Sequence, residues 1–334
     1  MADKKQGQFG EYGETFRTFP ATPTVPLHPA IQAMLAAEVP GPPLDAMPIN
    51  EARVLREGMM LQRPRRDEPV ARVEDWMIPG SGLGIPARVY TPSGKVGPHP
   101  ILVFFHGGGW VFGTLETHGD ICRTLCHRSG SLVVSVDYRR APEHRFPAAL
   151  EDCCAAVRWC AGHAAEIGGD PTRLAVAGDS AGGNLAAAVA LRGRDNGGPT
   201  LALQVLIYPV TNCAFDTASY HQYASGYGLT RDMMRYFWKS YLSRPADANH
   251  PAASPLQAAD LAGLPPALVL TAQYDVLRDE GEAYAARLAQ ASVPVRCTRY
   301  LEMNHGFVQL GALCEPALQG LMEIAESVRT SFAR

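Results

Sequence analysis

A serine with a glycine two positions to either side is the first group in this sequence whose setting suggests chemistry. In the stretch AVAGDSAGGNLA, Ser180 lies between Gly178 and Gly182, after an apolar run and before a run of small residues that predicts a helix. A serine in a sharp strand-to-helix turn of the form G-x-S-x-G exposes its hydroxyl at the edge of a sheet, where it can act as a nucleophile. An ordinary turn serine or helix N-cap has the same pattern, so the motif alone leaves both interpretations open.

A second glycine-rich segment, FFHGGGW, follows another apolar run and contains Gly107, Gly108 and Gly109. Successive glycines leave backbone N–H groups accessible, and such donors stabilise the negative charge that builds up on a carbonyl oxygen during acyl transfer. A phosphate-binding loop is the alternative, but the segment lacks both the G-K-[ST] ending and the G-x-G-x-x-G spacing. We expect His106 to hydrogen-bond within this loop and hold its shape.

A serine nucleophile needs a base, and the base needs an acid that orients it. Asp275 follows the predicted strand ALVLTAQY, and His305 follows the predicted strand VRCTRYL, so both are expected at the same sheet edge as Ser180. Asp279 and Glu280 are rival acids, but they fit the charged first turn of the next helix. Six of the other histidines fit loops, surfaces or helix ends: His118, His127, His144, His163, His221 and His250. Asp179, beside the serine, is expected to have a structural role.

Strands and helices alternate from about residue 72 onward, which predicts an α/β fold with a mostly parallel sheet covered on both faces. Several predicted strands are continuous apolar runs, as in strands buried on both faces. The predicted strands are 72–78, 87–92, 101–106, 132–138, 174–179, 203–209, 267–275 and 295–301. The predicted helices are 28–39, 49–62, 117–130, 147–168, 181–194, 230–242 and 279–292.

Two segments interrupt this alternation: the proline-rich residues 1–70 and a long connection that begins at residue 211. A long insertion between core strands is usually functional and is often a lid. Its helix, TRDMMRYFWKSYL, is expected to be apolar nearly all round, which fits packing on the N-terminal segment, lining of an acyl pocket, or both. We expect 1–70 and 211–250 to form a cap over a catalytic domain of 71–210 and 251–334. The predicted pocket residues are Trp110, Tyr208, Met233 and Phe237.

The composition of the 334-residue chain is that of an ordinary globular protein, with 46% hydrophobic and 19% charged residues. A net charge of −3 gives no basic footprint for nucleic acid, and no apolar run is long enough to predict a membrane span or a secretory signal. Cys122, Cys126 and His127 are the nearest approach to a metal-ligand cluster, but they fit a buried helix stripe better. We therefore expect no metal, no cofactor, reduced cysteines and a cytoplasmic protein.

Five motifs in order, HGGGW, SVDYRRAPEHRFPAALED, GDSAGGN, YDVLRDEGEAYAARL and NHGF, resemble those of hormone-sensitive-lipase-like esterases, and the elbow has that family's GDSAG form. The resemblance covers about residues 70–330 and implies an eight-stranded α/β-hydrolase fold with a two-part helical cap. It implies Ser180 as nucleophile, His305 as base and Asp275 as orienting acid. The oxyanion hole would be formed by Ala181 and two of the glycines 107–109, and the sequence leaves open which two donate. Two positions depart from the family pattern without removing a catalytic group: Val276 and Asn304.

The function expected from these residues is hydrolysis of short- to medium-chain acyl esters by a serine carboxylesterase. An amidase, lactonase, carbamate hydrolase or acyltransferase would use the same triad, so the sequence leaves these activities open. Hormone receptors of the gibberellin type share the fold but have lost the catalytic histidine, whereas His305 is present here. The expected binding partner is a small-molecule ester. Because family members are often dimers, we also expect a homodimer.

Overall fold

The computed structural model describes residues 25–37, 46–80, 82, 84–94 and 96–333. Within them, eight strands form one sheet in the order β1-β2-β4-β3-β5-β6-β7-β8, which confirms the predicted fold class. β1 pairs antiparallel with β2, and β2 with β4, while all the other neighbours are parallel. The strands are β1 (Arg72–Ile78), β2 (Ile85–Thr91), β3 (His99–Phe105), β4 (Leu132–Val136), β5 (Gly169–Asp179), β6 (Leu203–Ile207), β7 (Ala267–Tyr274) and β8 (Val295–Asn304).

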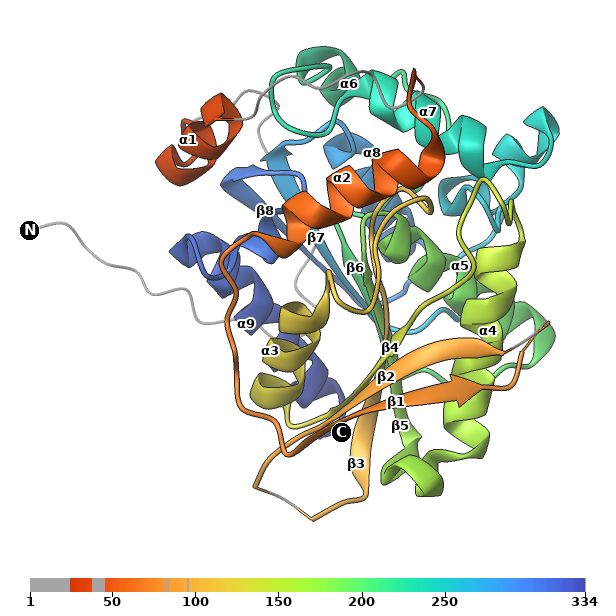
Figure 1. Cartoon of the computed structure of the whole chain (residues 1–334). Coiled ribbons are helices and arrows are strands. Elements are labelled where there is room, and N and C mark those ends of the chain that lie inside the picture. The colour runs from red at the N-terminus through yellow and green to blue at the C-terminus, as the bar shows by residue number, and fades with distance from the viewer. Residues whose placement is uncertain (1–24, 38–45, 81, 83, 95, 334) are drawn as a thin grey trace, which may run out of the picture.

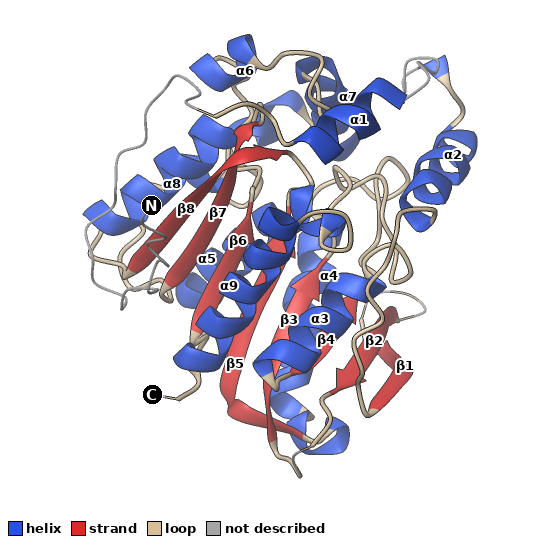
Figure 2. Ribbon diagram, turned by 90° about the vertical axis from the view of Figure 1, so that its left-hand side faces the viewer, coloured by secondary structure: helices blue, strands red, loops and turns tan. Residues whose placement is uncertain are grey.

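Helices cover both faces of this sheet (Figure 2). On one face α3 (Gly119–Ser129) packs against α9 (Glu315–Ser331), and on the other α4 (Ala148–Gly162) packs against α5 (Ala181–Asn196). Helix α8 (Arg278–Gln290) packs on β7 and β8. The sequence interpretation did not include α9, and it extended α4 to residue 168, where the structure has a separate 3₁₀ turn.

Four helices lie beyond the carboxyl ends of the strands, at the top of Figure 1. They are α1 (Pro29–Ala37), α2 (Ile49–Leu61), α6 (Ala218–Gln222) and α7 (Arg231–Tyr241). The expectation that α7 is apolar nearly all round is wrong, because Asp232, Arg235 and Lys239 are exposed on its outer face. Residues 1–24, and the predicted helix end 38–39, lie outside the described residues.

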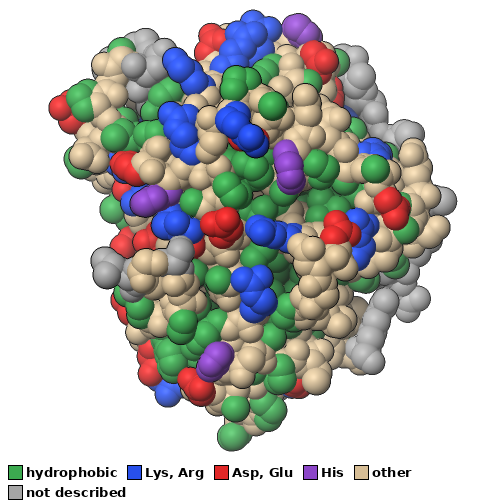
Figure 3. Space-filling model, turned by 90° about the vertical axis from the view of Figure 1, so that its right-hand side faces the viewer, with side chains coloured by type: hydrophobic (Ala, Val, Ile, Leu, Met, Phe, Trp, Pro, Cys, Tyr) green, Lys and Arg blue, Asp and Glu red, His purple; other side chains and the backbone are tan. Residues whose placement is uncertain are grey.

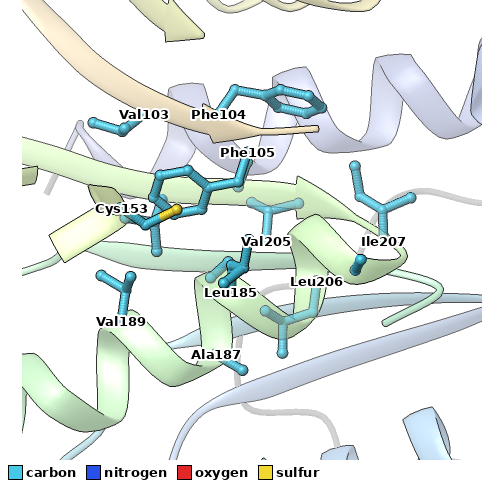
Figure 4. Packing of buried hydrophobic residues seen from close by; sticks show 14 of the residues in the cluster. Val103, Phe104, Phe105, Cys153, Leu185, Ala187, Val189, Val205, Leu206 and Ile207 are labelled. Atoms are coloured by element: carbon cyan, nitrogen blue, oxygen red, sulfur yellow. The ribbon is translucent and has the colours of Figure 1, made fainter. Parts of the chain in front are cut away.

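The centre of the core fixes the helix that follows the candidate nucleophile. Figure 4 shows side chains of β3, β6 and α5 pointing toward one another, among them Phe105, Val205 and Leu185. All three are fully buried, and burial of a large apolar side chain stabilises a fold by roughly 1.5–3 kcal/mol. Every residue of α5 from Ala181 to Leu191 is buried, so the N-terminus of this helix has a fixed place in the fold.

The surface carries charges of both signs. On the face shown in Figure 3, basic and acidic side chains lie among hydrophobic ones rather than in separate regions. This distribution matches the net charge of −3. Among the described residues, no helix combines the length and the apolar character needed to cross a bilayer.

Candidate active site

The turn between β5 and α5 holds Ser180 in a strained backbone conformation, with φ 58° and ψ −117°. The Ser180 N–H donates to the carbonyl oxygen of Ile207 on the neighbouring strand at 2.8 Å. A Cβ atom on Gly178 would collide with the backbone of Gly182, and one on Gly182 would collide with the carbonyl oxygen of Phe105. The two glycines therefore permit the close approach of strand and helix that the turn requires.

The three residues predicted to act together lie in one hydrogen-bonded chain at the carboxyl edge of the sheet. His305 Nε2 lies 2.9 Å from Ser180 Oγ, and His305 Nδ1 lies 2.7 Å from Asp275 Oδ2. The second carboxylate oxygen of Asp275 accepts the N–H of Leu277 at 2.9 Å, which fixes the carboxylate plane. Asp275 is 1% exposed, so this chain runs from a buried acid to a serine at the cavity floor.

The rival acids are committed to other contacts. Asp279 forms an ion pair with Arg278 at 2.7 Å. Glu280 is buried, and its carboxyl oxygen Oε1 accepts the N–H of Thr211 at 2.7 Å. Burial raises the pKa of Glu280 to about 8, against the lowering effect of the N–H groups that donate to it. Both acids therefore serve the structure around α8, and Asp275 is the acid that contacts His305.

The glycine-rich loop between β3 and α3 lies beside Ser180. Gly108 and Gly109 have positive φ angles of 113° and 62°, and both line the cavity above Ser180. Gly107, which was expected among the oxyanion donors, instead donates its N–H to Asp179 Oδ1 at 2.8 Å. Ala181 is the first residue of α5, a position at which the N–H has no acceptor within the helix.

The structure shows which groups contact Asp179, for which the sequence predicted only a structural role. It is 2% exposed, and its Oδ1 lies 3.3 Å from Nε2 of His118 as well as near Gly107. Burial alone would raise the pKa of the Asp179 carboxyl, but His118 and the Gly107 N–H outweigh it and lower the pKa. His118 does stand at the start of α3, as expected, but it is fully buried against Asp179.

His106 supports the loop from behind. Its Nδ1 lies 2.9 Å from the carbonyl oxygen of Gly107, and its ring stacks on Tyr138 with 4.3 Å between the ring centroids. The Tyr138 hydroxyl donates to the carbonyl oxygen of His106 at 2.7 Å. These contacts match the expected role of His106 in holding the shape of the loop.

A cavity opens above Ser180 and His305, with a largely apolar wall. Met233 and Phe237, two of the predicted pocket residues, line it. A Cβ atom on Gly109 would collide with the Phe237 ring, so α7 rests directly on the glycine-rich loop. Further apolar residues of the wall come from α1, α2 and the segments near α7 and β8: Met34, Leu35, Met59, Met60, Leu229 and Leu310.

The other two predicted pocket residues, Trp110 and Tyr208, lie outside this lining. Trp110 is fully buried and stacks on Tyr241 of α7, with 4.0 Å between the ring centroids. Tyr208 is 1% exposed and packs behind the imidazole of His305 at 4.7 Å between the centroids. Trp110 therefore packs against helix α7 and Tyr208 against the imidazole of His305, and neither lines the cavity.

The cysteines near α3 behave as a buried stripe. Cys122 and Cys126 are both buried, and the Cys126 thiol donates to the carbonyl oxygen of Tyr90 at 3.3 Å. Burial raises the pKa of both thiols. In the part of the chain that the structure describes, no group of three or more histidine, cysteine or acidic side chains is arranged to hold a metal ion.

Comparison with known proteins relates the chain to α/β hydrolases and esterases. A family model described as alpha/beta hydrolase fold matches residues 102–309. The chain is 45% identical over 269 residues to the carboxylic ester hydrolase LipN of Mycobacterium tuberculosis, covering 78% of this chain and 71% of that protein. It is 36% identical to the ethyl acetate hydrolase of Pseudomonas putida, covering 86% of this chain and 92% of that protein.

The solved structures that resemble this chain are also esterases. A thermostable esterase from Pseudomonas putida ECU1011 superposes with a TM-score of 0.88 at 40% identity, covering 93% of this chain and 99% of that one. The hyperthermophilic esterase of Pyrobaculum calidifontis superposes with a TM-score of 0.85 at 43% identity, covering 92% and 99% of the two chains. The chain therefore belongs to the α/β-hydrolase fold family, among its hormone-sensitive-lipase-like esterases.

Proposed function

We propose that the protein is a serine carboxylesterase that hydrolyses esters of short- to medium-chain acids through Ser180, His305 and Asp275. The observation that carries this proposal is the continuous contact from Asp275 through His305 to Ser180, with distances of 2.7 and 2.9 Å. A hydroxyl within hydrogen-bond reach of an imidazole, which is oriented by a buried carboxylate, is the arrangement that activates serine for attack on a carbonyl carbon.

In the first half-reaction, Ser180 Oγ attacks the ester carbonyl carbon while His305 Nε2 takes the hydroxyl proton. The carbonyl oxygen becomes an oxyanion, and the N–H groups of Gly108, Gly109 and Ala181 are the donors that we assign to it. Gly107 is left out, because its N–H is bound to Asp179. His305 then gives the proton to the departing alkoxide, and the alcohol leaves an acyl group on Ser180.

In the second half-reaction, water replaces the alcohol. His305 takes a proton from the water as its oxygen attacks the acyl carbon, and the same donors hold the second oxyanion. Collapse of this intermediate breaks the bond to Ser180 Oγ, which recovers its proton from His305. Asp275 keeps the imidazole in the required orientation throughout and stabilises its positive charge.

The short- to medium-chain acyl length is what the family resemblance implies, and the lining of the cavity supports an apolar acyl group. We assign 1–70 and 211–250 to a cap over the catalytic domain of 71–210 and 251–334, since α1, α2 and α7 all contribute to the lining. Four methionines face the cavity: Met34, Met59, Met60 and Met233. The flexible, polarisable methionine side chain adapts to differing apolar shapes, which suits acyl chains of several lengths.

Hydrolysis of p-nitrophenyl esters from acetate to decanoate, with one anilide and one lactone in parallel, tests the function. We expect the highest kcat/KM among short or medium esters and loss of nearly all activity in Ser180→Ala. The control is Ser331→Ala, which removes a hydroxyl near the end of α9. Near wild-type rates in Ser180→Ala would refute the assignment of Ser180 as nucleophile. Faster cleavage of the anilide or the lactone than of the esters would identify the protein as an amidase or a lactonase instead.

Two finer expectations stay proposals: a homodimer, which the family resemblance implies, and a cytoplasmic location, which fits the expectation of reduced cysteines. One is a homodimer in solution, for which light scattering after size-exclusion chromatography should give twice the mass of the 334-residue chain. The other is a cytoplasmic location, for which fractionation of the producing cells should recover the esterase activity with cytoplasmic markers. A monomeric mass, or activity in another fraction, would remove the corresponding proposal.

A further inference from the structure

One side of α2 faces the substrate cavity and carries both apolar and cationic groups. Arg56, Met59, Met60 and Arg63 all line the cavity, and their spacings of three, four and seven residues place them along one helix face. Arg63 lies just beyond the last residue of α2, so it extends this face past the helix end. Two guanidinium groups therefore flank two thioethers on the wall of the cavity that also contains Ser180 and His305.

Other charged residues of α2 are used to fasten the helix. Arg53 donates to the carbonyl oxygen of Val111 at 3.0 Å and forms an ion pair with Glu143 at 2.7 Å. Glu57 forms an ion pair with Arg140 at 2.7 Å. These contacts bind α2 to the segments that follow the glycine-rich loop, so the orientation of its cavity face is fixed.

Arg56 differs from both of these residues. It is half-buried and lines the cavity, yet it has no hydrogen-bond or ion-pair partner among the residues that the structure describes. Arg63 donates to Gln309 at 2.6 Å. The acid in the described lining, Asp179, is committed to Gly107. Among the residues that the structure describes, no carboxylate forms an ion pair with Arg56.

A substrate that covers such a cation removes water from it, which costs free energy unless the substrate supplies an anion. The planar guanidinium group matches a carboxylate with two parallel hydrogen bonds. We propose that the enzyme prefers esters whose acyl part ends in a carboxylate, as in monoesters of dicarboxylic acids, and that Arg56 pairs with that carboxylate. This inference rests on the proposed function: hydrolysis adds water across the ester C–O bond and leaves the remote carboxylate unchanged.

The test compares p-nitrophenyl monoesters of dicarboxylic acids of increasing spacer length with the same esters whose remote carboxyl is a primary amide. The quantity measured is the ratio of kcat/KM for the carboxylate ester to that for its amide. We expect a ratio above one in the wild type at one or two neighbouring lengths, and a fall of about fivefold in Arg56→Gln, the upper range for a partly exposed ion pair. Arg56→Lys should recover part of the ratio, because it restores the charge without the two-pronged geometry.

The matched control is Arg158→Gln on α4, an exposed arginine outside the cavity lining, which should keep the wild-type ratio. Raising the salt concentration from 0.05 to 0.5 M should reduce the wild-type ratio and leave that of Arg56→Gln nearly constant. A ratio at or below one at every length, or an equal ratio in wild type and Arg56→Gln, would overturn the inference. Failure of the proposed function is distinguishable, because it would abolish hydrolysis of the amide-capped and unsubstituted esters as well.

Discussion

The carboxylate of Asp179 holds the backbone of Gly107 across the active site, accepting its N–H at 2.8 Å. Asp179 directly precedes the nucleophile, and Gly107 directly precedes the two glycines that face the cavity. One hydrogen bond therefore links the turn that carries Ser180 to the loop whose N–H groups we propose as oxyanion donors. Since oxyanion donors act only when they are aimed at the developing charge, we expect this bond to matter for the rate of catalysis.

Replacing Asp179 by alanine should lower kcat by about 10- to 100-fold, less than the 100- to 1,000-fold typical for loss of an oxyanion donor itself. KM should change little, since Asp179 positions the loop and makes no bond that is specific to the ground state. Asp179→Asn should recover part of kcat, because its amide oxygen can still accept the Gly107 N–H. Steady-state kinetics with p-nitrophenyl butyrate measure the effects on kcat and on KM separately. A raised KM with an unchanged kcat would contradict the positioning role of Asp179.

Replacing Asp275 by asparagine should lower kcat by about ten-thousand-fold, the loss that follows when an imidazole is held in the wrong tautomer. The control is Asp279→Asn, which neutralises the neighbouring acid that pairs with Arg278. Circular dichroism should show that both variants are folded. Comparable losses of kcat in both variants would mean that Asp275 is not the orienting acid.

Filling the cavity from α7 should change the preferred acyl length. Met233 lines the cavity, so Met233→Phe should reduce kcat/KM for the octanoyl ester relative to the acetyl ester by about tenfold, which corresponds to ~1.4 kcal/mol of overpacking. The same substitution at Met322, a methionine of α9 that is 44% exposed, is the control. An unchanged ratio of octanoyl to acetyl rates in Met233→Phe would show that α7 does not limit the acyl chain.

The buried carboxyl of Glu280 should make stability depend on pH. Burial raises its pKa in the folded protein from 4.5 to about 8. Between these values the folded protein holds a proton that the unfolded chain has lost, so unfolding releases a proton and stability falls as the pH rises. The contribution of the Glu280 carboxyl to the free energy of unfolding is fully present below about pH 4.5. It is lost as the pH rises through 8.

The variant Glu280→Gln should remove this dependence, because its amide oxygen can still accept the N–H of Thr211 and never ionises. Urea unfolding of both proteins at pH 5, 6, 7 and 8 should show the variant gaining stability over the wild type by up to ~1.4 kcal/mol per pH unit. The control Glu326→Gln, at an ion pair on the surface of α9, should follow the wild type over this range. Parallel curves for wild type and Glu280→Gln would contradict the raised pKa.

The sequence predicted the sheet well because most of its strands are apolar runs bounded by turns, and because a parallel sheet brings all its carboxyl ends to one edge. That geometry alone is enough to bring Asp275 and His305 toward Ser180. Helix α9 was missed although its apolar positions, such as Leu321, Ile324 and Val328, follow a helical spacing that could have revealed it.

Other features depend on contacts between distant segments and have no local signal. His118 is buried because Asp179, 61 positions along the chain, faces it across the loop. Trp110 lies outside the cavity because Tyr241 of α7 covers its ring. The place of Arg56 on the cavity wall likewise follows from how α2 is fastened at Arg53, which the pattern of charges in the sequence does not reveal.

The contact between Gly109 and Phe237 has a consequence for anyone who wishes to redesign the acyl pocket. Because the Phe237 ring occupies the space next to Gly109, it is at once part of the pocket wall and a support for the loop beneath it. Trimming this ring to admit bulkier acids would also remove one of the supports of that loop. Met233 also lines the wall, whereas the atoms nearest to Gly109 belong to Phe237, so Met233 is the better place to widen the pocket without slowing the enzyme.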